Sequence, residues 1–270
     1  EAPTFPNHVD LLNLNICSIK GDIRDSDKLN KTFKEHKPEI VFHLAAQPLV
    51  REGYKSPVYT WETNLNGTIN ILESLRLIKK RCATVIVTTD KVYREDESIY
   101  GYRENDSLGG YDPYSCSKSA VELAVHSWRK SFFNLEKTNV YLATARAGNV
   151  IGGGDWSDDR LIPDCIKSWS KKKSVVIRNP KSTRPWQHVL EAINGYLIFG
   201  VKLKNNSKLD GEVFNFGPNN LLNHKVEDLV KKIEVFWKDI KWIVKPDKLK
   251  IESNLLRINS NKAKKKLNWK

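Results

Sequence analysis

The sequence predicts an α/β protein built on a doubly wound parallel sheet. Three apolar runs of strand length, residues 39–44, 83–88 and 140–145, are separated by stretches with helical periodicity. Strands that alternate with helices form parallel sheets covered on both faces and joined by right-handed crossovers. Ligands bind such sheets beyond the carboxyl ends of the strands. We therefore expect the residues that follow these three runs to meet at one edge.

The elements of the first third follow in order. Residues 15–19 have the pattern of a short strand. A helix is expected over residues 29–36, where Pro38 stops it. The run 39–44 is apolar enough to be a strand buried on both faces. Residues 59–80 then carry a long helical pattern.

The pattern changes after residue 147. A helix over residues 114–132 and the strand at 140–145 come before this point, and a glycine-rich loop over residues 148–156 follows it. The elements expected beyond the loop are a helix from 160 to about 172, a strand at 175–178, a helix entered near 189 and continuing over 195–203, a strand at 213–216 that returns to the sheet, and a helix over 226–237. We therefore expect a smaller lobe interwoven with the sheet.

Composition excludes several classes of protein. At 270 residues and 40% hydrophobic content, the chain can bury a substantial core. No window approaches eighteen consecutive apolar residues, and the first ten residues are polar, so we expect neither a membrane span nor a secretory signal. Cys17, Cys82, Cys116 and Cys165 are far apart, which favours thiols in a reducing cytoplasm over disulfides or a metal site.

The formal charge of +13 raises the question of nucleic-acid binding. Residues 221–270 hold fourteen Lys and Arg against six Asp and Glu, so most of the excess lies in the last fifth of the chain. No nucleic-acid motif accompanies it. We expect no nucleic-acid partner, and we interpret residues 262–266 as a solvated helix face.

Four residues suggest acid–base chemistry. Thr89 and Asp90 follow the strand at 83–88, and Tyr114 and Lys118 open the next helix. Residues four apart share one helix face, so the Lys118 ammonium can favour the ionised form of Tyr114 and lower its pKa. Such a phenol can remove a proton from a sugar hydroxyl near neutral pH.

The Tyr-x-x-x-Lys spacing is weak evidence by itself. About one match is expected by chance among nine tyrosines in this lysine-rich chain, and there is one. An ordinary amphipathic helix with an exposed lysine explains most such matches. The order of elements is more specific: an apolar strand, Thr-Asp-Lys, a glycine-containing loop, and then this pair at the start of a helix.

Longer motifs are more specific still. They are HLAAQPLVREGY, TTDKVY, GYRENDSLGGYDPYSCSK, RAGNVIGGGDW, DRLIPD and VVIRNPKSTRPWQHVLE. Together they resemble the CDP-glucose 4,6-dehydratases of the extended short-chain dehydrogenase/reductase family, over nearly the whole chain. The resemblance implies a Rossmann-like fold, NAD as cofactor and a nucleotide sugar, CDP-glucose, as substrate.

The implied reaction has three stages. The sugar C4 hydroxyl is oxidised, water is lost across C5 and C6, and the hydride returns to C6 to give a 4-keto-6-deoxy sugar. The resemblance makes Tyr114 the base of the first step, with Lys118 lowering its pKa and holding the nicotinamide ribose. Thr89 would hydrogen-bond the same hydroxyl. Asp90 would protonate the departing C6 hydroxyl, which requires a raised pKa.

Lys91 departs from the pattern of many relatives. Enzymes of the family that act on dTDP-glucose or GDP-mannose typically have Glu there and use it to remove the C5 proton. A lysine can do so only when it is neutral, through burial or a neighbouring cation. Otherwise Lys91 stabilises the developing enolate, and the sequence leaves both roles open.

The resemblance also implies a cofactor site. The matching positions are Asp22 and Ile23 at the adenine, Ala45, Ala46 and Gln47 on the pyrophosphate side, Asn64 as a polar bridge between helix and active site, and the shared Tyr114 and Lys118. Asp22 also suits a turn or a helix cap. We interpret His43 as a buried core histidine and not as a catalytic one.

The implied substrate contacts lie in the second half of the chain. They are Asn149 at the sugar or diphosphate, Arg160, Leu161, Ile162 and Pro163 around the nucleotide, Arg184 at a phosphate, and Arg257 late in the chain. A guanidinium fork suits two phosphate oxygens. Arg257 is loosely matched and is equally a candidate surface charge. Gly152 to Gly154 lack the dinucleotide-binding frame and are interpreted as a flexible loop near the sugar.

The chief departure from the family lies at the amino-terminal end of the sequence. The family begins with a strand and a Gly-x-x-Gly-x-x-Gly turn that binds the NAD pyrophosphate, and these 270 residues contain no such turn. We expect residues 1–148 to form an amino-terminally truncated NAD-binding domain. Residues 149–270 would form the sugar-nucleotide-binding region, with about 187–216 returning to the first domain and the family's final helix missing.

Three functions remain open on the sequence. The chain is a CDP-glucose 4,6-dehydratase, another sugar-nucleotide dehydratase or epimerase of the same fold, or a truncated fragment that binds the sugar nucleotide without NAD. We expect a homodimer in which the helices over 59–80 and 114–132 pack against their copies. The alternative is that their apolar stripes face only the sheet.

Overall fold

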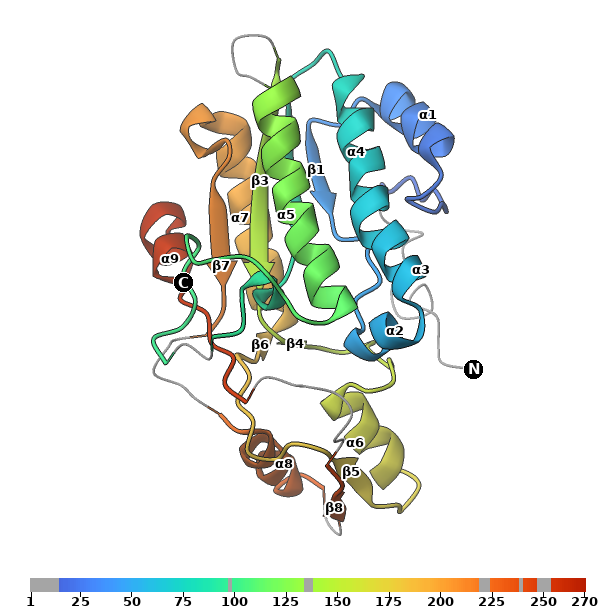
Figure 1. Cartoon of the computed structure of the whole chain (residues 1–270), viewed down its shortest axis with the longest axis vertical. Helices are drawn as coiled ribbons and strands as arrows, with labels where there is room; N and C mark the ends of the chain where they lie inside the picture. The colour runs from blue at the N-terminus through green and yellow to red at the C-terminus, as the bar shows by residue number, and fades with distance from the viewer. Residues whose placement is uncertain (1–14, 97–98, 134–137, 219–223, 238–239, 247–253) are drawn as a thin grey trace.

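The computed structural model describes residues 15–96, 99–133, 138–218, 224–237, 240–246 and 254–270 (Figure 1). Its centre is a four-stranded parallel sheet with the order β1-β2-β3-β7. The strands are β1 (Ile40–His43), β2 (Cys82–Val87), β3 (Val140–Ala147) and β7 (Val213–Phe216). The α/β class and the parallel sheet that the sequence predicts are confirmed.

Helices cover both faces of this sheet, as Figure 1 shows with α4 and α5 in front and α7 behind. The front layer consists of α1 (Ser26–His36), α4 (Gly67–Arg76) and α5 (Pro113–Phe132). Leu72 and Val121 from these helices pack against Ile86 of β2 in one core cluster. Behind the sheet, Phe199 of α7 (Val189–Asn205) packs against Phe214 of β7 with ring centroids 4.8 Å apart.

The strand register aligns the carboxyl ends of the central strands. His43 of β1 pairs with Ile86, and Val87 of β2 pairs with Ala145 of β3. The chain therefore leaves these strands along one edge, where parallel sheets bind their ligands.

Local signals set the start of the two helices that flank this edge. Asp112 caps α5, because its Oδ1 accepts hydrogen bonds from the backbone N–H groups of Tyr114 at 2.9 Å and Ser115 at 3.0 Å. Asp25 caps α1 by accepting from the backbone N–H of Lys28 at 3.0 Å. Lys37 ends α1 in the left-handed conformation, one residue before Pro38. The expected helix ending at Pro38 is therefore confirmed.

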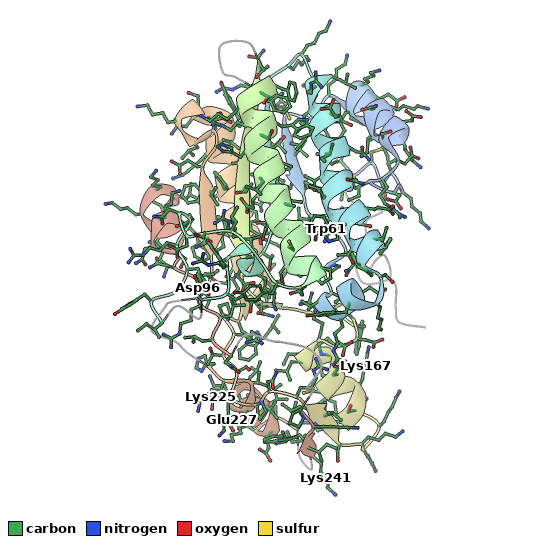
Figure 2. The ribbon with its side chains drawn as sticks, in the orientation of Figure 1. Trp61, Asp96, Lys167, Lys225, Glu227 and Lys241 are labelled. Carbon is green, nitrogen blue, oxygen red and sulfur yellow. The ribbon has the colours of Figure 1, made fainter. Side chains whose placement is uncertain are left out.

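A smaller lobe lies below the sheet in Figure 1. Its elements are α6 (Leu161–Trp169), β5 (Val175–Ile177), α8 (Val226–Glu234) and β8 (Trp242–Val244). Cys165, Trp169 and Val230 form its own small core. Figure 2 shows Lys167, Lys225, Glu227 and Lys241 on this lobe. The two-residue strands β4 (Val150–Ile151) and β6 (Gln187–His188) pair where the chain passes between lobe and sheet.

Two expectations about the first elements are wrong. Residues 15–19 do not form a strand: Ile16 and Ile19 are about half exposed, and no strand of the described residues pairs with the outer edge of β1. A strand needs a hydrogen-bonding neighbour, and this segment has none in the described structure. For the same reason β1 itself is half-buried, although its apolar sequence suggested burial on both faces.

The long helix expected over residues 59–80 is displaced and interrupted. It begins with α3 (Pro57–Trp61), passes through the π-helical turn η2 (Glu62–Asn66) and ends with α4 at Arg76. π-helical turns inside helices are frequent at functional sites. This one carries Asn64, which the sequence places at the cofactor.

The end of the chain returns to the sheet, which the sequence did not indicate. Leu267 of α9 (Asn261–Leu267) and Trp269 are buried in the core behind the sheet, where Trp269 stacks edge-on to Phe216. On the outer side, Lys262 and Lys266 pair with Glu212 at 2.6 and 2.7 Å. The basic run is therefore a solvated helix face, as predicted. In the part of the chain that the structure describes, no helix is long and apolar enough to cross a bilayer.

Candidate functional site

Three predicted catalytic residues meet at the edge of the sheet. Thr89 caps the short helix η3 (Asp90–Val92) and donates a hydrogen bond from Oγ1 to Asp90 Oδ1 at 3.1 Å. The hydroxyl of Thr89 also lies close enough to the phenol of Tyr114, at the start of α5, to influence the pKa of that phenol. A group that reaches one of these side chains is therefore within reach of the others.

Asp90 is suited to act as an acid. Its side chain is buried, and its Oδ2 has no hydrogen-bond partner among the described residues. Burial raises the pKa of Asp90 to about 6, although the charges of Lys91 and Arg184 and the bond to Thr89 oppose the rise. Part of the population therefore keeps its proton near neutral pH, as the sequence argument required.

The expected fall in the pKa of Tyr114 is wrong in this structure. Burial raises the pKa of Tyr114 to about 12, and the bond to Thr89 and the charge of Arg160 only partly offset it. Lys118 Nζ donates to the backbone carbonyl of Val87 at 3.1 Å. Burial also lowers the pKa of Lys118 to about 8, with Glu122 acting against it. Helix spacing predicts that two residues share a face, but the desolvation of both groups depends on the packed fold.

Lys91 lies at the junction of this cluster with a cavity. Its side chain is half-buried and lines the cavity wall, while its backbone N–H donates to Thr89 Oγ1 at 3.3 Å. This position is compatible with both predicted roles, proton transfer and enolate stabilisation, which stay predictions.

Of the predicted cofactor residues that follow β1, some are exposed and others form hydrogen bonds within the protein. Leu44 and Ala45 are exposed where β1 ends. Gln47 is buried and its amide is used within the protein, since Nε2 donates to Thr60 Oγ1 at 2.8 Å. Asn64 accepts from the backbone N–H of Gln47 at 2.8 Å and donates to Ser117 of α5 at 2.9 Å. The polar bridge predicted for Asn64 is therefore present, between the loop after β1 and α5.

Asp22 and Ile23 lie beside the same helical segment. Gly67 permits this contact, because a Cβ atom there would be 2.5 Å from Cδ1 of Ile23. Asp22 forms an exposed turn in which its carboxylate accepts from Arg24 Nη2 at 2.7 Å, and this bond lowers the pKa of Asp22 to about 2. The residue that caps α1 is Asp25, so Asp22 is a turn residue and not the helix cap.

His43 behaves as a core residue. Its Nε2 lies 2.9 Å from Thr68 Oγ1, inside the fold. Burial, and secondarily the charge of Lys118, lower the pKa of His43 to about 3. The imidazole is therefore neutral at physiological pH, in agreement with the interpretation of the sequence.

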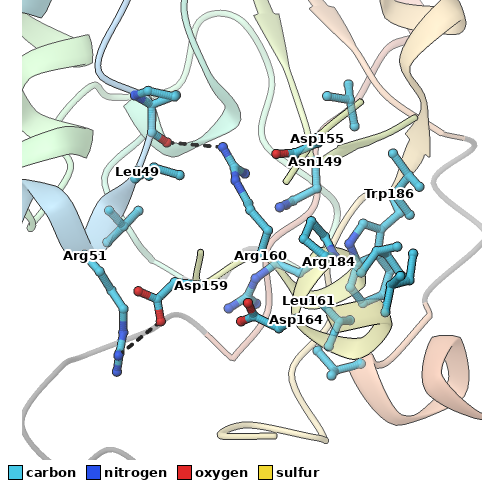
Figure 3. Close-up of a pocket in the computed structure, with 18 of the residues that line it drawn as sticks. Leu49, Arg51, Asn149, Asp155, Asp159, Arg160, Leu161, Asp164, Arg184 and Trp186 are labelled. Carbon is cyan, nitrogen blue, oxygen red and sulfur yellow. Dashed lines mark hydrogen bonds and ion pairs between the residues drawn. The ribbon is translucent and has the colours of Figure 1, made fainter. Parts of the chain in front are cut away.

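A cavity of about 320 Å³ opens between the sheet edge and the lower lobe (Figure 3). Six of the seven predicted substrate residues line it: Asn149, Arg160, Leu161, Ile162, Pro163 and Arg184. Arg257 does not line it, and its guanidinium donates to the backbone carbonyl of Ile99 at 3.0 Å. A nucleotide contact for Arg257 stays a prediction.

Two cavity arginines were missed by the sequence reasoning. Arg51 and Arg178 both pair with Asp159, at 3.2 and 3.0 Å, and Figure 3 shows the Arg51 pair at the cavity wall. Arg51 comes from α2 (Val50–Lys55) beside the sheet, and Arg178 follows β5 in the lower lobe. The sequence could have indicated both arginines, since each lies inside a motif on which the family resemblance rests.

The glycine run at the cavity is more constrained than a flexible loop. A Cβ at Gly152 would lie 2.4 Å from Val189 Cγ1, and Gly154 has a φ of 85°. Both positions therefore require glycine, one for close packing and the other for its backbone conformation. The glycines form a loop at the cavity, where the sequence predicted a loop near the sugar. Packing and backbone conformation, and not flexibility, explain why these positions are glycines.

The cavity adjoins the acid–base cluster at Lys91. Lys91 belongs to both, Arg160 acts electrostatically on Tyr114, and Arg184 acts on Asp90. One wall supplies groups that exchange protons, and the other supplies guanidinium groups that suit an anion. Such an arrangement can hold a negatively charged ligand while presenting a sugar to Tyr114 and Asp90.

Comparisons with known proteins agree with this chemistry. Residues 6–270 match the family model described as GDP-mannose 4,6 dehydratase. The chain is 45% identical to the CDP-glucose 4,6-dehydratase of Salmonella typhimurium over 275 aligned positions, which cover all of this chain and 77% of that protein.

Solved structures share the fold. The UDP-glucose 4-epimerase of Thermotoga maritima, solved with UDP-glucose, superimposes with a TM-score of 0.82 at 23% identity, covering 97% of this chain and 81% of that one. The dTDP-glucose 4,6-dehydratase of Bacillus anthracis, solved with NAD, gives a TM-score of 0.76 at 22% identity, covering 93% and 73%. With its motifs placed around one site and its family model matched almost from end to end, the chain belongs to the GDP-mannose 4,6-dehydratase family of sugar-nucleotide enzymes.

Proposed function

We propose that this protein is an NAD-dependent CDP-glucose 4,6-dehydratase, a hydro-lyase that converts CDP-glucose to CDP-4-keto-6-deoxyglucose. The observation that carries the proposal is the meeting of Thr89, Asp90 and Tyr114 beside an arginine-lined cavity. The 45% identity to a CDP-glucose 4,6-dehydratase supports the choice of substrate.

The first step uses the phenol of Tyr114. It removes the proton from the sugar C4 hydroxyl, and Thr89 holds that hydroxyl through a hydrogen bond. Because the pKa of Tyr114 is about 12 in the unliganded protein, nearby positive charge has to lower it for catalysis at neutral pH. Lys118, whose pKa is about 8, is largely protonated at pH 7 and can supply part of that charge.

The second step uses Asp90. Its protonated carboxyl gives a proton to the departing C6 hydroxyl, which leaves as water. Its Oδ2, which is buried and has no hydrogen-bond partner among the described residues, is the proposed proton donor. Lys91 either removes the C5 proton or stabilises the enolate that forms.

The described residues fit part of an NAD site. Ala45 is exposed and Ala46 half-buried at the end of β1, where their small side chains leave room for a bulky ligand. The helical segment from Glu62 contacts both this loop and Ile23. Bound there, NAD would supply the hydride chemistry, as acceptor from C4 and later as donor to C6. Lys118 would hold the nicotinamide ribose, and Asp22 would meet the adenosine half.

The cavity arginines would hold the substrate diphosphate. Arg160 and Arg184 are the proposed contacts, because a guanidinium donates to two phosphate oxygens at once. Asn149 would contact the sugar or the diphosphate, and Leu161 to Pro163 would frame the nucleotide.

Product analysis tests the function directly. The purified chain is incubated with NAD and, separately, with CDP-, dTDP- and UDP-glucose and GDP-mannose, and mass spectrometry is used to detect loss of one water. We expect the dehydrated product from CDP-glucose. Thermal shifts with the same panel report binding, so stabilisation by a sugar nucleotide without turnover would identify a binding fragment instead. Dehydration of another sugar nucleotide alone would reassign the substrate.

Isotope exchange tests Lys91. In deuterium oxide, the Lys91→Ala variant should still reduce NAD in the first step but should not place deuterium at C5 if Lys91 transfers that proton. Normal incorporation at C5 would leave only the role of enolate stabilisation.

We also propose that the protein is a cytoplasmic homodimer. Its four cysteines are unpaired thiols, which suits a reducing compartment. Leu123 and Phe132 of α5 are exposed, and exposed apolar side chains on a helix suit a helix-to-helix interface. Sedimentation of the protein and of Leu123→Glu tests this: a wild-type monomer would exclude the dimer.

A further inference from the structure

One carboxylate oxygen in the cavity lies between two guanidinium groups. Oδ1 of Asp159 is 3.2 Å from Nη1 of Arg51 and 3.0 Å from Nη1 of Arg178. All three residues line the cavity, and Figure 3 shows the pair of Arg51 and Asp159 at its wall. Two guanidinium groups that converge on one oxygen form an anion-binding arrangement, because each presents N–H donors in a fixed fork. In this structure the chain itself supplies the anion.

The two arginines come from opposite sides of the cavity. Arg51 lies on α2 beside the sheet, whereas Arg178 follows β5 in the lower lobe. Asp159 belongs to neither element, since it lies in the turn that leads into α6. Each of the three side chains keeps about a quarter of its surface exposed. A ligand can therefore replace the carboxylate, because solvent weakens the attraction between partly exposed charges.

The backbone of Asp159 is held in an unfavourable conformation. Its φ is 63°, in the left-handed region that residues other than glycine seldom adopt and in which aspartate is one of the better tolerated. Strained residues persist where neighbouring contacts fix them, and here two ion pairs fix the side chain. Displacement of the carboxylate would let this backbone relax, which partly offsets the loss of the ion pairs.

The ion pairs lie next to a phosphate contact proposed above. Asp159 is followed directly by Arg160, and Nη2 of Arg160 donates to the backbone carbonyl of Pro48 at 3.3 Å, three residues before Arg51. Figure 3 shows Arg160 beside the Arg51–Asp159 pair. Two positions for an anion are therefore neighbours in the cavity. A diphosphate has two adjacent anionic groups and fits such an arrangement.

We propose that Arg51 and Arg178 form a second anion subsite, which binds one phosphate of the nucleotide diphosphate, and that the carboxylate of Asp159 occupies this subsite until the ligand displaces it. Asp159 is then an autoinhibitory contact: it keeps the two arginines in place and lowers the apparent affinity for the ligand. The choice of a nucleotide diphosphate as ligand rests on the proposed function, whereas the subsite itself requires only a phosphate group.

Calorimetric titration with CDP, without NAD or turnover, tests the exchange. In Asp159→Asn the two guanidinium groups lose their internal competitor, so the affinity for CDP should rise about two- to fivefold, the factor that corresponds to a partly exposed ion pair. Asp158→Asn is the matched control, because Asp158 is exposed, pairs with Lys167 and does not line the cavity. Its affinity for CDP should equal that of the wild type.

Two results of this comparison would overturn the proposal. An equal rise in both aspartate variants would assign the effect to general repulsion of the anion. A fall in affinity in Asp159→Asn would make Asp159 a bridge that positions the arginines, and not a competitor of the ligand.

Arginine variants in the Asp159→Asn background show whether the two guanidinium groups contact the ligand. Arg51→Gln and Arg178→Gln should each weaken CDP binding by about tenfold or more there, as expected for a lost hydrogen bond to a charged group. The control is Arg76→Gln, which removes an exposed partner of Glu73 outside the cavity and should have no effect. Unchanged CDP binding in both cavity variants would reject the subsite. If a glutamine variant does not fold, lysine replaces it, since lysine keeps the charge but loses the fork and should still weaken binding.

Three further ligands identify what the subsite binds. Cytidine lacks phosphate, so its affinity should be the same in the wild type and in Asp159→Asn. CDP-glucose should respond to the variants as CDP does. If inorganic pyrophosphate responds and the two nucleotides do not, the subsite binds free phosphate and its assignment to the nucleotide is rejected. Absent dehydration of CDP-glucose, with these changes in binding intact, would count against the proposed function alone.

Discussion

The catalytic edge of the sheet and the cavity beside it use charge in different ways. At the edge, Glu122 and Arg146 are about 4% exposed and each is held by several partners. At the cavity wall, Asp159 holds Arg51 and Arg178 with all three side chains about a quarter exposed. The first arrangement is fixed inside the fold, and the second remains open to a ligand.

This difference has consequences for the pKa values. Burial shifts the pKa of Asp90 up to about 6 and that of Lys118 down to about 8. Shifts of this kind suit groups that must gain and lose protons near neutral pH. The cavity arginines, about a quarter exposed, can exchange a protein carboxylate for a phosphate, which suits binding.

Breaking the buried pair should have the largest effect. Arg146→Met leaves Glu122 buried without its counter-charge, so we expect a loss of about 3–5 kcal/mol in the free energy of unfolding. Chemical denaturation measures it. The matched control is Arg76→Met, which removes an exposed pair with Glu73 and should cost about 1 kcal/mol or less. If Arg146→Met and Arg76→Met lowered the free energy of unfolding equally, the distinction between the buried and the exposed ion pair would be contradicted.

Asp90→Asn should raise the stability of the protein and lower its dehydration activity. The raised pKa of Asp90 means that the folded state binds this proton more tightly than the unfolded state does. Stability is therefore lost as pH rises from about 4 to about 6, the two pKa values. Removing the carboxylate should stabilise the protein at pH 7.5 by about 2–3 kcal/mol, with no gain below about pH 4.

The same variant should lose dehydration by a factor of about 10² or more, because its amide cannot donate the proton. The control is Asp96→Asn, an exposed aspartate that pairs with Arg94 and does not line the cavity. It should change stability by less than about 0.5 kcal/mol. A destabilised Asp90→Asn protein at pH 7.5 would show that burial is not the main influence on this carboxyl.

At the cavity, Arg184→Gln should weaken substrate binding. Loss of a guanidinium–phosphate contact should raise KM or Kd by about tenfold or more, since a hydrogen bond to a charged group contributes about 1.5–3 kcal/mol. Arg257→Gln is the comparison, because Arg257 lies outside the cavity lining. Calorimetry with the nucleotide sugar measures both, and an equal loss for Arg257 would restore its predicted role.

Asp159→Asn should have the smallest effect. It releases Arg51 and Arg178 from a half-exposed ion pair, so stability should fall by about 1 kcal/mol or less. Affinity for the diphosphate should stay equal or rise, because the carboxylate no longer competes for the two arginines. Asp158→Asn is a close control, since Asp158 is exposed and pairs with Lys167. A loss of affinity confined to Asp159→Asn would mean that Asp159 positions the arginines for the ligand.

Parts of the fold and site followed from sequence with little ambiguity. The apolar runs became β1, β2 and β3, and the helix expected over residues 114–132 is α5. The alignment of strand ends then brought Thr89, Asp90 and Tyr114 together, as the topology of a parallel sheet requires. These features depend on local patterns and on chain order, which a single sequence contains.

Other features needed the packed structure. The strand expected at residues 15–19 failed because strand formation depends on a neighbour and not on the segment itself. Arg51 and Arg178 come from segments far apart in the chain, so no local spacing indicated that one carboxylate would join them. The return of Trp269 to the sheet core was missed for the same reason.

By itself, the sequence determined the α/β class and the order of the elements, since periodicity and chain order encode them, and its motifs predicted the acid–base residues. Only the tertiary structure decided how those residues are charged. Burial raised the pKa of Tyr114, where helix spacing had suggested a fall, and Glu122 and Arg146 emerged as one buried pair behind Lys118. The physical reason is that desolvation depends on everything that surrounds a group, and those neighbours come from all parts of the chain.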